Sequence, residues 1–174
     1  MLLLEKRGAD VIITEEGVKV ATTVGQEVAL EIIKKYLVYT SREEYLFAQF
    51  YKAAEAGKEN TIHELLAQGV KPDLKDSRNV SPLWIAVLHG HLRVVELLLD
   101  TGGVDINLES ISGRTPIFWA AAHGYEDIVG LLLRAGADPN LTGEDGRTPL
   151  SIAKHHGHGK IVSMLAGVSK CREH

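Results

Sequence analysis

The sequence predicts an all-α solenoid, in which short helix–turn–helix units stack side by side. Three observations support this fold class. Glycines that can end a helix recur at Gly57, Gly90, Gly124 and Gly157, at intervals of 33, 34 and 33 residues. Each glycine lies between two short apolar segments, which is the pattern of a helix pair. The chain has 174 residues, of which 45% are hydrophobic, and this is enough for a short stack with one core.

The clearest unit begins at Gly113, which supplies a turn where a positive φ is inexpensive. Thr115 can cap a helix with its hydroxyl, and Pro116 suits the first helical position. A short helix is therefore predicted over 117–123, ended by Gly124. A second helix follows, with apolar residues at Ile128, Val129, Leu131, Leu132 and Leu133, and it ends at Gly136.

The same unit recurs one period earlier and one period later. The earlier copy replaces the turn glycine with Asn79, which also tolerates left-handed geometry. The later copy repeats Gly146-Arg147-Thr148-Pro149, and we expect its second helix to end near Leu165. Gly102 and Gly103 explain the one longer interval, as a single insertion after the second helix.

A period near 33 residues with a Thr-Pro-Leu signature resembles the ankyrin repeat. The resemblance covers residues 43–174 and divides them into repeats at 43–75, 76–109, 110–142 and 143–174, the last as a C-terminal cap. The first repeat is degenerate, because Ala48 and Gln49 stand where Thr-Pro is expected. Its first helix should therefore start earlier and run straight from Arg42.

Residues 1–42 are expected to form a helical N-terminal cap or a degenerate repeat. Helices are predicted over 15–23 and 27–39, with Gly25 between them. This segment resembles the short helical repeats found ahead of ankyrin repeats in fungal NACHT-type, NLR-like receptors. That resemblance implies an alternative function, the ligand-sensing C-terminal part of such a receptor.

Composition and charge exclude several classes of protein. The formal net charge of −4 gives no basic field for nucleic acid. No apolar run approaches the length of a membrane span, and Met1–Leu4 is too short for a signal-peptide core. Cys171 is the one cysteine, so no intrachain disulfide can form. We therefore expect an intracellular, cytoplasmic protein, with the nucleus as an alternative.

No catalytic motif is present, so we expect no enzyme activity and no cofactor. Eight histidines invite a metal hypothesis, but their spacing follows the repeat. His89, His123 and His156 each precede a helix-ending glycine, so a stack of these rings that titrates near neutral pH is one alternative. We expect no metal site, because zinc needs about four convergent ligands. A metal-binding or small-molecule-binding protein is the remote alternative.

The resemblance implies recognition of another protein by the loops between repeats, called fingers, and by the exposed side of the first helices. The candidate partner-binding residues lie on that face: Arg78, Val80, Trp84, Leu88, His89, Ile111, Arg114, Phe118, Trp119, His123, Arg147, His155 and His156. We expect a monomer, with weak self-association through Leu2–Leu4 as the alternative.

Two groups on this face leave alternatives open. Trp84 and Phe118 replace the usual histidine of the family, which removes a hydrogen-bonding partner for the cap residue before them. These rings either fill the space between repeats or anchor a partner together with Trp119. Arg114 and Arg147 occupy the same finger position and should form a row. That row favours an acidic or phosphorylated partner, unless Glu144 and Asp145 neutralise it.

Overall fold

A computed structural model describes residues 42–171 of the chain. The chain divides into two units, Met1–Gln49 and Phe50–His174, and the fold below is that of the second unit. The expected N-terminal cap, its two helices and the apolar Leu2–Leu4 segment lie outside the described residues. Within the described part, no helix is long and apolar enough to cross a bilayer.

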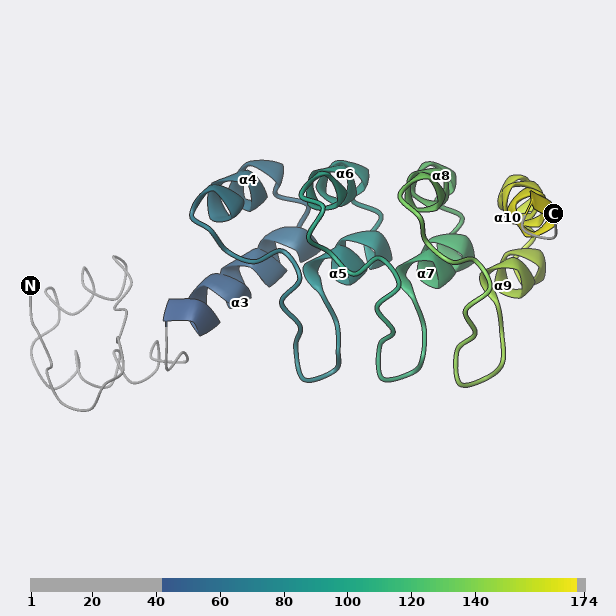
Figure 1. Cartoon of the computed structure of the whole chain (residues 1–174), viewed down its shortest axis with the longest axis horizontal. Coiled ribbons are helices and arrows are strands. Elements are labelled where there is room, and N and C mark those ends of the chain that lie inside the picture. The colour runs from purple at the N-terminus through teal and green to yellow at the C-terminus, as the bar shows by residue number, and fades with distance from the viewer. Residues whose placement is uncertain (1–41, 172–174) are drawn as a thin grey trace, which may run out of the picture. The chain divides into compact units, whose positions relative to one another are not determined.

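The described residues contain eight helices and no strand, which confirms the all-α solenoid. The helices are α3 (Arg42–Glu55), α4 (Glu59–Ala67), α5 (Pro82–Leu88), α6 (Leu92–Asp100), α7 (Pro116–His123), α8 (Glu126–Arg134), α9 (Pro149–His155) and α10 (Gly159–Cys171). In the second unit, α5, α7 and α9 form one row, and α4, α6, α8 and α10 form another (Figure 1). Loops project from the first row, on the side away from the second.

The two end repeats test two sequence-based expectations about helix length. Helix α3 runs without a break from Arg42, as predicted from the missing Thr-Pro pair. Helix α10 extends to Cys171, so the prediction that it ends near Leu165 is wrong. The helix continues through Gly167, where glycine is only modestly unfavourable, and Leu165 anchors it in the core with 0% exposure.

Helix ends follow the predicted glycines. Gly124 ends α7 with a φ of 79°, and Gly157 follows α9 with a φ of 75°. Asn79 adopts a φ of 59°, so the turn survives its substitution as predicted. A Cβ atom on Gly124 would lie 2.7 Å from Cε1 of His158 in the next repeat. Two features therefore favour glycine at this position, the positive φ and the nearby His158 ring.

The core is continuous from one repeat to the next. Leu98, Leu132 and Leu165 hold the same position on α6, α8 and α10, and all three are fully buried. Val95 and Val129 add a second buried position on α6 and α8. Because one short helix pair buries too little apolar surface alone, these layers stabilise the fold only when stacked.

The starts of the first helices differ from each other. The Oγ of Ser81 accepts a hydrogen bond from the backbone N–H of Trp84 at 3.2 Å, and Thr148 forms a reciprocal capping box with Ser151. Thr115 forms no such cap, so the prediction that its hydroxyl caps α7 is wrong. Its Oγ1 is buried and has no hydrogen-bond partner in the described part of the chain. The third helical residue, Phe118, also has no side-chain hydroxyl that could complete a capping box as Ser151 does.

Candidate functional site

The fingers are three similar turns, at residues 76–80, 110–114 and 143–147. Each is closed by one backbone hydrogen bond, from Asp76 N–H to Val80 O at 3.0 Å, from Ser110 to Arg114 at 3.1 Å and from Gly143 to Arg147 at 3.2 Å. These turns form the projecting loops of Figure 1.

Backbone hydrogen bonds also fix the register between fingers. Ile111 N–H donates to Arg78 O at 3.2 Å, and one repeat later Glu144 N–H donates to Ser112 O at 3.2 Å. Equivalent residues therefore line up along the row. This order gives the side chains of different repeats a fixed spacing, which a binding face requires.

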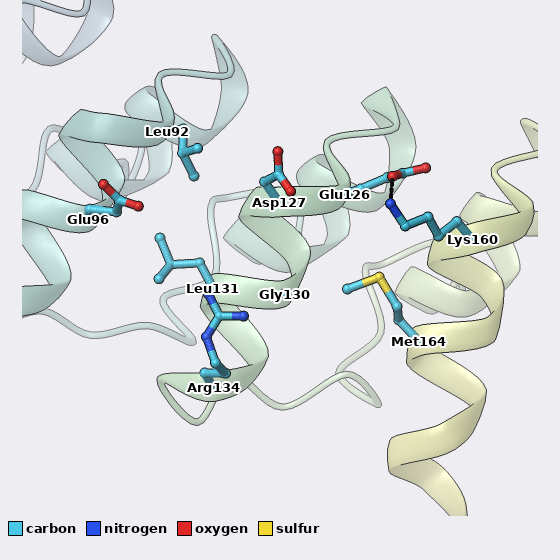
Figure 2. Close-up of a pocket in the computed structure, with 9 residues that line it drawn as sticks. All are labelled: Leu92, Glu96, Glu126, Asp127, Gly130, Leu131, Arg134, Lys160 and Met164. Carbon is cyan, nitrogen blue, oxygen red and sulfur yellow. Dashed lines mark hydrogen bonds and ion pairs between the residues drawn. The ribbon is translucent and has the colours of Figure 1, made fainter.

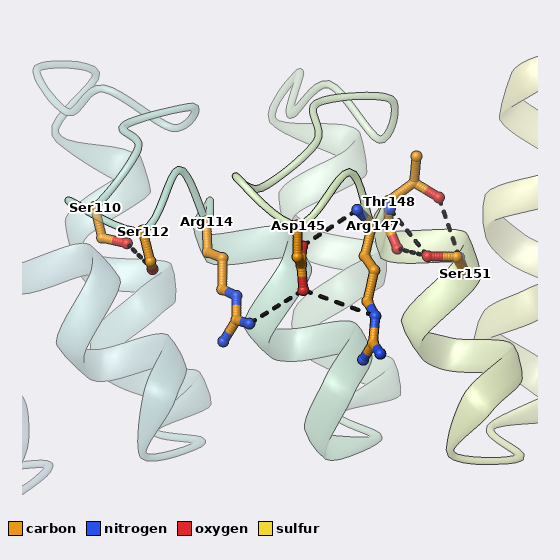
Figure 3. Close-up of polar contacts among 7 residues, drawn as sticks. All are labelled: Ser110, Ser112, Arg114, Asp145, Arg147, Thr148 and Ser151. Atoms are coloured by element: carbon orange, nitrogen blue, oxygen red, sulfur yellow. Dashed lines mark hydrogen bonds and ion pairs between the residues drawn. The ribbon is translucent and has the colours of Figure 1, made fainter.

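Arg114 and Arg147 share one carboxylate, as the sequence-based alternative allowed. Asp145 Oδ2 lies 3.3 Å from Nη2 of Arg114 and 3.7 Å from Nε of Arg147 (Figure 3). The backbone N–H of Arg147 and the Arg114 guanidinium hold the pKa of Asp145 below its usual value. The two arginines thus point to the same place, with part of their charge offset between them.

Arg114 also joins its finger to the first helix of the same repeat. Its guanidinium carbon lies 5.1 Å from the ring centre of Phe118 and 5.3 Å from that of Trp119. These distances are within the range of a cation–π interaction. Arg114 is therefore positioned from two sides, by Asp145 and by the two rings.

Arg78 is held by a separate group in the preceding finger. Its Nη2 lies 2.8 Å from Asp76 Oδ2 and donates to the Tyr51 hydroxyl at 2.8 Å. Burial alone would raise the pKa of Asp76, but hydrogen bonds from the Val80 and Arg78 N–H groups and from the Arg78 guanidinium lower it. Sequence reasoning did not include Tyr51 or Asp76, because neither belongs to a variable position of the repeat.

Three candidate binding residues are buried, which corrects their assignment. Val80 is 4% exposed, Trp84 8% and Phe118 2%. Trp84 instead donates its Nε1–H to the carbonyl of Arg114 in the next repeat at 3.2 Å, and its ring lies 5.8 Å from that of Trp119. The aromatic rings therefore fill the space between repeats, and of the cluster only Trp119 is partly exposed.

The histidines stack within their own repeats. His89 stacks on His91, and His156 on His158, with ring centres 6.1 and 6.0 Å apart. His123 stacks on Tyr125 at 5.5 Å. The alternative of a direct stack joining His89, His123 and His156 therefore gives way to three local pairs. No group of three or more His, Cys, Asp or Glu side chains that could hold a metal ion occurs within residues 42–171.

The remaining candidates are accessible. Ile111 is 65% exposed at the tip of its finger, and it is the only exposed large hydrophobic residue in the described segment. His89, His123, His155 and His156 are exposed near the ends of the first helices, and Leu88 is half-buried. Arg78 and Arg147 are exposed as well. The accessible candidates are thus an apolar finger tip, arginines and histidines.

Known proteins that resemble this chain share its repeats. A family model described as "Ankyrin repeats (3 copies)" matches residues 50–143, more than half of the chain. The mouse protein "Inactive serine/threonine-protein kinase TEX14" is 34% identical over 102 residues, which are 59% of this chain and 7% of that protein. "Palmitoyltransferase AKR1" of Lachancea kluyveri is 37% identical over 98 residues, 54% of this chain and 13% of that protein.

A third relative is smaller. The fission-yeast "Ankyrin repeat-containing protein P1E11.10" is 35% identical over 66 residues, 38% of this chain and 31% of that protein. The chain thus spans only a small part of each of these relatives. The matches do not confirm the fungal NLR-like resemblance of residues 1–40, which stays a prediction. Ankyrin repeats are generally non-catalytic modules for protein–protein interaction, and this chain belongs to the ankyrin-repeat family.

Proposed function

We propose that the second unit binds another protein through one face, formed by the fingers and by the exposed side of the first helices. The observation that carries this proposal is the backbone register between fingers, which aligns exposed side chains from successive repeats. The proposed contacts are Arg78, Ile111, Arg114 and Arg147 on the fingers and Leu88, His89, Trp119, His123, His155 and His156 on the helices. Val80, Trp84 and Phe118 support this face from beneath.

The chemistry of the fingers favours a partner with an acidic segment and an apolar side chain. The ion pairs of Asp145 with Arg114 and Arg147 are partly exposed, and pairs at the surface contribute little to stability. A carboxylate or phosphate of the partner can therefore replace Asp145 at the two guanidinium groups with little loss of stability. Ile111, in the same finger as Arg114, offers an apolar contact. A partner that covers this exposed side chain would remove it from water, which is favourable.

The test compares two kinds of arginine on the same protein. A partner is first captured with the wild-type chain and identified, and its affinity is then measured for each variant by calorimetry. Arg114→Ala together with Arg147→Ala should weaken binding and reduce its dependence on salt. Arg93→Ala is the matched control, because Arg93 on α6 also forms one surface ion pair, with Glu96 at 2.7 Å. Equal losses from both variants would rule out the finger face.

A further inference from the structure

The outer face of α8 carries a second feature, which lies in the helix row farther from the fingers (Figure 1). Residues of α6, α8 and α10 line an open pocket of about 300 Å³. Its lining includes Leu92 from α6, Asp127, Gly130, Leu131 and Arg134 from α8, and Met164 from α10 (Figure 2). The proposed binding face of the fingers does not use any of these residues.

Gly130 is the residue without a side chain among those that line the pocket. It lies in the middle of α8, where glycine is about 1 kcal/mol less favourable than alanine. Its φ is not positive, in contrast to the glycines that end helices in this fold. A Cβ atom there would lie 3.3 Å from Met164 Cε and 3.4 Å from Arg134 Nη1, which are the ends of flexible side chains. These two ends therefore rest on Gly130, and a methyl group there would require them to shift.

Neighbouring repeats carry a side chain at this position. Counted from the helix-ending glycine of each repeat, Gly130 corresponds to His63, Glu96 and Ser163. On α8 the ends of Met164 and Arg134 take the place of that side chain. Once these flexible ends move aside, the glycine permits another helix to approach closely.

Opposite charges lie on either side of Gly130. Asp127 precedes it by three residues and Arg134 follows it by four, so the two charges are seven residues, or two turns, apart on one face of α8. Both side chains are exposed, and neither forms an ion pair with another described residue. Two other acidic residues that line the pocket do have partners, because Glu126 pairs with Lys160 and Glu96 pairs with Arg93.

This pattern is complementary to itself. If a second α8 lies antiparallel over the first, a two-fold axis between Gly130 and Leu131 places Asp127 opposite Arg134 of the partner subunit. The same axis places Arg134 opposite Asp127 of the partner subunit, so one arrangement satisfies both charges. Leu131, Leu92 and Met164 lie beside the axis and supply the apolar contact. We propose that the chain forms a homodimer through this antiparallel pairing of α8.

Charge reversal tests the pairing. Sedimentation velocity of the full chain should show a dimer whose dissociation constant rises with salt. Asp127→Arg places two like-charged pairs in the dimer, and Arg134→Asp does the same with the opposite sign. Each single variant should therefore raise the dissociation constant by about ten-fold or more. The double variant exchanges the two charges and should recover dimerisation.

Mixing the two single variants gives a stronger test. Neither forms its own dimer well, but a heterodimer of Asp127→Arg with Arg134→Asp has two attractive pairs. An equimolar mixture should therefore dimerise more tightly than either variant alone. Lys154→Glu is the control, because Lys154 is an exposed cation of α9 that does not line the pocket, and it should leave the dimer unchanged.

A larger residue at Gly130 distinguishes an effect on dimerisation from an effect on folding stability. Gly130→Ala should raise the dissociation constant, while its thermal unfolding midpoint should stay close to the wild-type value, because the better helix former offsets the shift of Met164 and Arg134. A wild-type chain that is monomeric at every soluble concentration would overturn the proposal. A dimer that is unaffected by the charge reversals, or that the mixture does not restore, would overturn it equally.

Discussion

Helices α7 and α9 are preceded by the same sequence, Gly-Arg-Thr, and both start at a proline, but they differ in the number of first helices that pack against them. Gly113-Arg114-Thr115-Pro116 leads into α7, and Gly146-Arg147-Thr148-Pro149 leads into α9. Helix α7 packs against both α5 and α9. Among the described first helices, α9 has a neighbour only in α7. The comparison therefore shows how a first helix between two others differs from one at the end of the row.

The third helical residue shows the change. In α7 it is Phe118, whose ring is buried between repeats, and in α9 it is Ser151, which is exposed. Ser151 completes a capping box with Thr148, whereas Phe118 has no hydroxyl that could do so, and the hydroxyl of Thr115 has no partner in the described residues. An unsatisfied buried hydroxyl is unfavourable by about 1–3 kcal/mol, and a buried phenylalanine contributes about 1.5–3 kcal/mol. Between repeats, packing thus offsets the loss of the cap.

The largest expected effect comes from removing that packing. Phe118→Ala should lower the free energy of unfolding by about 3–5 kcal/mol, because it leaves a cavity between α5, α7 and α9. Urea unfolding followed by circular dichroism measures this change. Leu150→Ala on α9, where the side chain is only half-buried, should have a clearly smaller effect. Equal losses would remove the distinction between the two helices.

A second experiment separates backbone angle from the neighbouring repeat. Gly124 and Gly157 have nearly equal positive φ, but only Gly124 lies beneath a ring of the next repeat. A Cβ at Gly157 would meet nothing within 4 Å in the described part of the chain. Gly157→Ala should therefore lower stability by about 1–2 kcal/mol, and Gly124→Ala by more. Thermal unfolding of the two variants compares them, and identical shifts would show that His158 adjusts freely.

The caps should respond in opposite directions. Thr148→Ala removes the hydroxyl that accepts from the Ser151 N–H and should lower stability by about 0.5–2 kcal/mol. Thr115→Val replaces a buried hydroxyl that has no partner in the described residues, so it should be neutral or slightly stabilising. Chemical denaturation of both variants gives the sign. A clear loss from Thr115→Val would show that this hydroxyl is bonded in solution.

The smallest effect concerns the fingers and depends on pH. Asp145 occupies the position of Ser112 in the preceding finger, and its pKa is lowered in the folded chain, first by the Arg147 N–H. Its carboxylate therefore stabilises the fold above the ordinary pKa of 3.8, and this contribution is lost as pH falls through the lower folded value. The stability difference between wild type and Asp145→Ser should be small at neutral pH and vanish once the pH lies below the lowered pKa of the folded chain. A difference that persists in acid would exclude this ion pair as the cause.

Much of the fold could be read from local patterns. The recurrent glycines located the ends of the first helices, and the absence of Thr-Pro in the first repeat correctly predicted a continuous α3 from Arg42. Asn79 was expected to keep the turn, and its positive φ confirms this. These features depend on one residue and its own backbone, so neighbouring repeats are not needed to predict them. The candidate face could be assigned by repeat position, but not the burial of Val80, Trp84 and Phe118.

The sequence by itself determined the repeat length, the helix pairs and the residue types available on each face, because backbone preferences and apolar periodicity act within one repeat. Only the tertiary structure decided which of those residues remain accessible. Contacts across repeats bury Trp84, bring Asp145 between Arg114 and Arg147, and place Met164 of α10 against Gly130. Each of these features depends on side chains about 30 residues apart, whose distance is set by how the repeats stack.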